Sequence, residues 1–168
     1  TPVEYHKEAF ARIASRLEGS TKRCIVSFVD LYRKLTKRLR WLEDQGCVIR
    51  APDESEVAQL AEFLAACARN HGMTVTSCAE VIDMAPWGIV PGKCIDGEYV
   101  SSIFGTAADC RKDLSQRTAC GCSVSKDIGC YDTCIHGCRY CYATSNESRA
   151  RKRFAGHDPH ASSLVSGR

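Results

Sequence analysis

A dense run of cysteines constrains this chain more than any other feature of its sequence. Six of the twelve cysteines lie within residues 120–142. Among them Cys134, Cys138 and Cys141 form a Cys-x-x-x-Cys-x-x-Cys run, with Gly137 directly before the second cysteine. This spacing is typical of a loop that binds an iron-sulfur cluster.

Three interpretations compete for this run. Positions i, i+4 and i+7 line one helix face and would make the thiols core packing, but Gly137 and the polar His136 and Arg139 suit a helix core poorly. Zinc is a stronger rival, because thiolates two to four residues apart also suit tetrahedral zinc. A cubane cluster explains the spacing best, since three thiolates from one tight loop ligate three irons and leave the fourth iron open.

The composition limits the class of protein and its compartment. With 168 residues, 44% hydrophobic and 26% charged, the chain has the make-up of a soluble globular protein, and a net charge of +3 neither demands nor excludes an acidic partner. No run approaches the roughly 18 apolar residues of a membrane span, and the start TPVEYHKEAF does not resemble a signal peptide. We expect a cytoplasmic protein without membrane association, whose thiols are metal ligands, catalytic groups or buried side chains rather than disulfides.

Hydrophobic periodicity predicts helices that alternate with strands. Helices are predicted at residues 2–17, 31–42, 53–70, 96–104 and 147–154, and strands at residues 24–29 and 73–79. Asp53 with Glu56 predicts a capping box, and residues 86–92 predict an irregular connection. Strands separated by helices are the rhythm of an α/β unit with a mainly parallel sheet. Two strands are too few for a finished sheet, so we expect part of a larger domain.

The wider sequence resembles a known family. The run with Tyr140 before its last cysteine resembles the signature of radical S-adenosylmethionine enzymes. The string SKDIGCYDTCIHGCRYCYA, together with HKEAFARIASRL and IVSFVDLYRK, resembles the carboxy-terminal half of the domain of unknown function 1848 family, and this resemblance covers nearly the whole chain.

The resemblance implies an α/β fold class and two regions. Residues 1–105 would be the second half of an α/β partial-barrel domain, a fragment of a parallel, barrel-like sheet with surface helices, whose amino-terminal half is absent. Residues 106–168 would be an irregular, cysteine-rich, cluster-binding loop region with a carboxy-terminal helix and tail. The missing half of the domain is therefore an expected partner.

The same resemblance implies cofactors. Cys134, Cys138 and Cys141 would hold a [4Fe-4S] cluster, S-adenosylmethionine would chelate the open iron, and Tyr140 would help seat its adenine. An electron donor would reduce the cluster, and the resulting radical would act on an unknown substrate. Cys130 is either an incidental thiol or a fourth ligand that would close the open iron. The alternative function is a non-catalytic binding or scaffold module stabilised by zinc or by a fully ligated cluster.

A second cysteine set is formed by Cys78, Cys94, Cys120 and Cys122. Cys78 lies at a predicted strand end, Cys94 follows a Pro-Gly turn, and the hinge at Gly121 can aim its two flanking thiolates at one ion. The family resemblance covers these positions too. They can hold a second iron-sulfur cluster or zinc, and the alternative is four unrelated thiols.

A basic patch follows the cysteine run. It consists of Arg149, Arg151, Lys152 and Arg153. Such a patch can attract a nucleic-acid backbone, but balancing the charge of an anionic cluster explains it better. Nucleic acid is therefore not the partner we favour.

Overall fold

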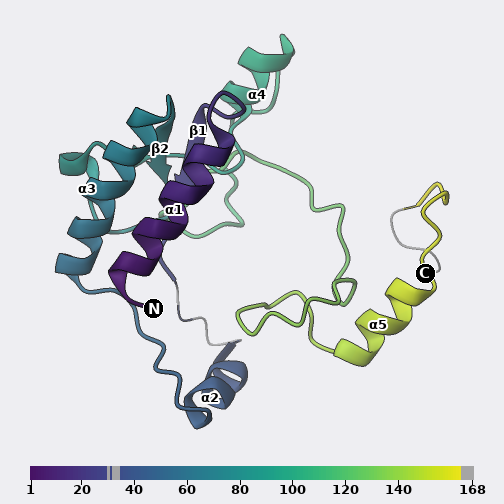
Figure 1. Cartoon of the computed structure of the whole chain (residues 1–168). Helices are drawn as coiled ribbons and strands as arrows, with labels where there is room; N and C mark the ends of the chain where they lie inside the picture. Colours follow the sequence, from purple (N-terminus) through teal and green to yellow (C-terminus); the bar gives the residue numbers. More distant parts are fainter. Residues whose placement is uncertain (30, 32–34, 164–168) are drawn as a thin grey trace. The chain divides into compact units, whose positions relative to one another are not determined.

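The computed structural model describes residues 1–29, 31 and 35–163 (Figure 1). The described helices are α1 (Val3–Leu17), α2 (Thr36–Asp44), α3 (Glu54–Asn70), the 3₁₀ helix η2 (Ala85–Trp87), α4 (Gly97–Phe104) and α5 (Glu147–Ala155). The strands are β1 (Arg23–Val26), β2 (Thr74–Ser77) and β3 (Val90–Pro91). The chain divides into two compact units. Unit 1 comprises Thr1–Val29 and Pro52–Ser125, and unit 2 comprises Asp30–Ala51 and Lys126–Arg168.

The sheet of unit 1 is small, parallel and open. Its strand order is β1-β2-β3, with Cys24 of β1 opposite Val75 of β2, and Ser77 of β2 opposite Pro91 of β3. The predicted α/β class with a fragment of a parallel sheet is confirmed, and the sheet does not close into a barrel. The third strand, β3, lies in the stretch predicted to be an irregular connection. It was not predicted because two residues are too few to show a strand pattern.

The hydrophobic core of unit 1 lies where α3 packs against α1 and β2 (Figure 1). Its buried members come from α1, α3, β2 and the segment around η2: Ala14, Val57, Leu60, Ala61, Leu64, Ala65, Ala68, Met73, Val75, Met84 and Ile89. Six of these side chains recur at helical spacing along α3, which is why the sequence predicted this helix well.

Local capping signals set the helix ends. The predicted capping box of α3 is present: the amide of Glu56 donates to Asp53 Oδ1 over 2.9 Å, and the amide of Asp53 donates to Glu56 Oε2 over 3.0 Å. Asp96 caps α4 by accepting from an amide three residues on, and Asn146 caps α5 in the same way. The helix predicted from Leu31 is described only from Thr36, and residues 32–34 lie outside the described part of the chain.

Among the described residues, no helix combines the length and apolar character needed to cross a bilayer. The predicted domain boundary after residue 105 stays a prediction.

Candidate metal centres

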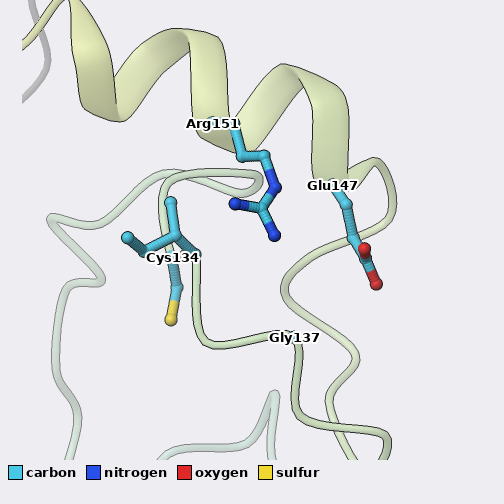
Figure 2. A pocket seen from close by; sticks show the side chains of 5 residues that line it. Cys134, Gly137, Glu147 and Arg151 are labelled. Carbon is cyan, nitrogen blue, oxygen red and sulfur yellow. The ribbon is translucent and has the colours of Figure 1, made fainter.

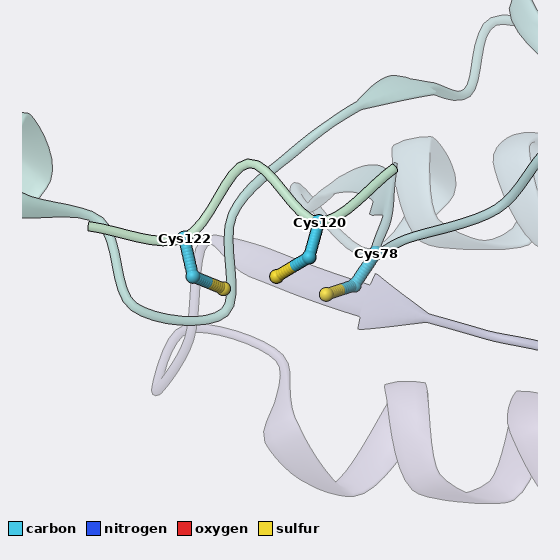
Figure 3. A group of neighbouring side chains, drawn as sticks. All are labelled: Cys78, Cys120 and Cys122. Atoms are coloured by element: carbon cyan, nitrogen blue, oxygen red, sulfur yellow. The ribbon is translucent and has the colours of Figure 1, made fainter. Parts of the chain in front are cut away.

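Three thiols converge at the carboxyl end of β2 in unit 1. Figure 3 shows the side chains of Cys78, Cys120 and Cys122 pointing toward one another, and all three sulfur atoms lie within 4.8 Å of one another. Cys120 and Cys122 are each only 6% exposed, whereas Cys78 is half-buried. This cysteine group can hold a metal ion. Within the described ranges, no other three His, Cys, Asp or Glu side chains meet the same spacing.

The sheet positions Cys78. Its amide donates to the carbonyl of Val26 over 3.0 Å, so the pairing of β1 with β2 extends to the thiol-bearing residue. The chain then turns away at Ala79, whose φ of 56° lies in the left-handed region. A carboxylate oxygen of Glu80 accepts from the amide of Phe28 over 2.8 Å and fixes this turn to the segment after β1.

Ser123 positions the other two thiols. Its side chain is 1% exposed, its amide donates to the carbonyl of Ile95 over 2.8 Å, and its hydroxyl accepts from the amide of Gly97 over 3.0 Å. The carbonyl of Cys122 accepts from the amide of Asp113 over 2.9 Å. These bonds tie the cysteine hinge to the segment before α4, to the first residue of α4 and to Asp113 beyond it.

The thiols of this group influence one another electrostatically. Burial, together with the neighbouring Cys94 and Cys122, raises the pKa of Cys78 to about 11. The pKa of Cys122 is lowered: burial opposes the change, but the amide of Ile95, 3.4 Å from its sulfur, and the amide of Cys94 outweigh it. Cys94 itself is exposed and lies outside the close group of three, yet it acts on two members of that group.

Asp132 closes the cysteine loop of unit 2. Its carboxylate, only 3% exposed, accepts from the amides of Ser145 (2.6 Å) and Asn146 (2.9 Å) and lies 3.4 Å from the guanidinium of Arg149. Its own amide donates to the carbonyl of Ala143 over 2.9 Å. These donors, the amide of Asn146 foremost, hold the pKa of Asp132 below its usual range. Residues 133–142 therefore form a loop fastened at its base.

The fastened loop carries the three cysteines predicted to bind a cluster. Cys134 and Cys138 are exposed and Cys141 is half-buried. Gly137, with a φ of 64°, makes the left-handed turn before Cys138. The pKa of Cys141 is lowered: burial opposes this change, but the amides of Thr144 and Ala143 outweigh it. The three sulfur atoms of this loop do not meet the spacing found in unit 1.

The two further residues singled out near the run are Cys130 and Tyr140. The sulfur of Cys130 accepts from the guanidinium of Arg153 over 3.3 Å, and this residue precedes Asp132, outside the fastened loop. Arg153 also donates to the carbonyl of Tyr131. Tyr140 lies on the loop itself and is 44% exposed.

A small pocket lies between the loop and α5. It is lined by Cys134, Ile135, Gly137, Glu147 and Arg151. Figure 2 shows the side chains of Glu147 and Arg151 extending from α5 toward the loop.

Glu147 was not identified from the sequence, and Arg151 was considered only as part of the basic patch. Their separation by four residues, just after the cysteine run, is the signal that places both on one helix face.

Comparison with known families decides the relationship. Residues 1–143 match a family described as Domain of unknown function (DUF1848). The chain belongs to this family. The matched region of this DUF1848 protein includes every cysteine predicted as a ligand, and the resemblance inferred from the sequence is confirmed. No curated protein and no solved structure matches the chain.

Proposed function

We propose that this DUF1848 protein binds a [4Fe-4S] cluster through Cys134, Cys138 and Cys141 and uses it with S-adenosylmethionine for radical chemistry on a substrate. The observation that carries the proposal is the loop fastened by Asp132, which holds these three thiols and leaves Cys130 outside, beside Arg153. Three thiolates satisfy three irons of a cubane and leave one iron for an external ligand.

The donor set fits such a cluster. Thiolates are the usual ligands of iron-sulfur clusters, and the lowered pKa of Cys141 favours its thiolate form. Gly137 permits the left-handed turn before the middle cysteine, Cys138, and places no side chain beside it.

When bound and reduced by an external one-electron donor, such a cluster supplies the electron that splits S-adenosylmethionine into methionine and a 5′-deoxyadenosyl radical, which takes a hydrogen atom from the substrate. The chain's own residues have simpler tasks. Asp132 holds the loop in shape, and Tyr140, on the same loop, would help seat the adenine.

The test is cleavage of S-adenosylmethionine by the full chain, reconstituted without oxygen and reduced with dithionite. We expect 5′-deoxyadenosine and methionine in equal amounts from the parent chain and none from Cys134→Ala, Cys138→Ala or Cys141→Ala. Cys130→Ala is the matched control and should retain cleavage. Cleavage that survives in the three loop variants, or that is lost only in Cys130→Ala, would refute the assignment.

A second candidate function is a non-catalytic scaffold module organised by metal. The close group of Cys78, Cys120 and Cys122 favours it, because buried, converging thiols stabilise a fold once a metal is bound. This candidate predicts a protein that carries only zinc, or a cluster whose spectrum does not respond to S-adenosylmethionine.

A further inference from the structure

We propose that Cys78, Cys94, Cys120 and Cys122 form a mononuclear, structural zinc site in unit 1. This site goes beyond the proposed function and does not depend on it, because it uses none of the three loop cysteines. The starting observation is the close group of three sulfur atoms, all within 4.8 Å of one another, at the carboxyl end of β2 (Figure 3).

The spacing of these sulfur atoms favours a single ion over a cluster. With zinc–sulfur bonds of about 2.3 Å and tetrahedral angles, ligand sulfur atoms stand about 3.8 Å apart. The three sulfur atoms, all within 4.8 Å of one another, lie near that spacing. A cubane separates its thiolates more widely, since each binds a different iron and sulfides fill the space between. The two buried thiols, Cys120 and Cys122, leave little room for such a core.

Cys94 supplies the fourth ligand. The amide of the next residue, Ile95, donates to the sulfur of Cys122 over 3.4 Å, so Cys94 lies one residue from a group that contacts this thiol. It is exposed, and its side chain can turn inward.

The backbone before Cys94 is fixed. The amide of Gly92 donates to the carbonyl of Ser77 over 2.7 Å, and a Cβ at Gly92 would lie 2.4 Å from Thr76 Oγ1. Cys94 therefore follows, two residues later, a backbone position at Gly92 that is held against β2. Structural zinc sites are four-coordinate and closed, and this turn provides the closing residue.

Groups around the thiols suit a site of net negative charge. Four thiolates around one zinc ion carry a net charge of −2, which nearby hydrogen-bond donors and cations stabilise. The amide of Ile95 already donates to the sulfur of Cys122 over 3.4 Å. A Cβ at Gly121 would lie 3.5 Å from the Cγ of Lys93, so the lysine side chain runs along the cysteine hinge.

Such a site fastens three separate segments. Cys78 follows β2, Cys94 follows β3, and Cys120 with Cys122 belongs to the loop beyond α4. The strand β3 at this sheet edge has only two residues and therefore few ladder hydrogen bonds. Metal bonds between these segments would stabilise the edge further.

The experiment uses the full chain with Cys134→Ser, Cys138→Ser and Cys141→Ser combined. These changes remove the proposed cluster ligands of the loop, so that bound metal can be assigned to unit 1. We expect one zinc per chain, no acid-labile sulfide after reconstitution with iron and sulfide, and, with cobalt in place of zinc, the visible bands of a tetrahedral tetrathiolate. Adding Cys94→Ser should shift these bands to those of three sulfur ligands, while adding Cys110→Ser, an exposed thiol of the same unit, should not. Stoichiometric labile sulfide, absence of bound zinc, or an unchanged spectrum in the Cys94 variant would overturn the proposal.

A second measurement uses the parent chain, in case the combined variant fails to fold. Cysteine alkylation is followed residue by residue with and without zinc, by mass spectrometry of peptides. Zinc should slow the alkylation of Cys78, Cys94, Cys120 and Cys122 together. Alkylation rates at these four positions that are the same with and without zinc would contradict the site.

Discussion

Asp132 is the residue on which the geometry of the cysteine loop most depends. Its carboxylate joins the start of the loop to the amides of Ser145 and Asn146 and to Arg149 at the start of α5. Its φ of 58° is a left-handed conformation that Asp and Asn adopt more readily than most other residues. The position therefore needs both the carboxylate and the backbone tolerance of this residue type.

Replacing Asp132 with alanine should impair cluster assembly. The amides of Ser145 and Asn146 would lose their acceptor, and alanine disfavours the left-handed backbone. We expect less iron and less sulfide per chain after reconstitution than in the parent. Asp127→Ala is the control, because that carboxylate accepts from the amide of Gly129, within its own turn. Equal metal contents in the two variants would argue against the role of Asp132.

Gly92 is the residue that determines how closely the segment before Cys94 approaches β2. A Cβ here would lie 2.4 Å from Thr76 Oγ1 and 3.3 Å from the carbonyl oxygen of Ser77. Gly92→Ala should therefore lower the free energy of unfolding of the metal-free protein by about 1–3 kcal/mol, as overpacking does elsewhere. Urea unfolding measures this change. Gly121→Ala, whose Cβ would meet its nearest neighbour at 3.5 Å, is the control, and an equal loss in both variants would refute the clash.

At the scale of elements, the sequence predicts best what depends on neighbouring residues. The caps at Asp53, Asp96 and Asn146 act within three residues, so sequence alone located the starts of α3, α4 and α5. The strand β3 was missed because its pairing with β2 is a long-range contact of two residues. The thiols of unit 1 were predicted as a set of four. The close spacing of three of them, and the exposure of Cys94, depend on tertiary structure that no local pattern encodes.

The capping box of α3 gives a prediction at this scale. Asp53→Ala removes the acceptor of the Glu56 amide and should lower the free energy of unfolding by about 1 kcal/mol. The measurement is urea unfolding followed by circular dichroism. Ser55→Ala is the matched control, because the Ser55 hydroxyl accepts from the exposed side-chain amide of Gln59, and it should change stability by less than about 0.5 kcal/mol. A loss no greater in Asp53→Ala than in this control would contradict the role of the cap.

At the scale of the whole molecule, each compact unit carries its own group of cysteines. Unit 1 has a close group of three thiols that can hold a metal ion, and unit 2 has a fastened loop whose three thiols do not meet the same spacing. Membership of the DUF1848 family covers both groups and assigns a function to neither. The central claim is that the loop of unit 2 binds a cluster with one open iron.

Electron paramagnetic resonance of the reconstituted, reduced full chain tests that claim most directly, with spectra recorded before and after S-adenosylmethionine is added. An open iron predicts a [4Fe-4S] signal whose shape and position change on addition, and loss of this signal in Cys138→Ala. A cluster signal that is identical with and without S-adenosylmethionine, or a protein that takes up zinc but no iron, would contradict the account.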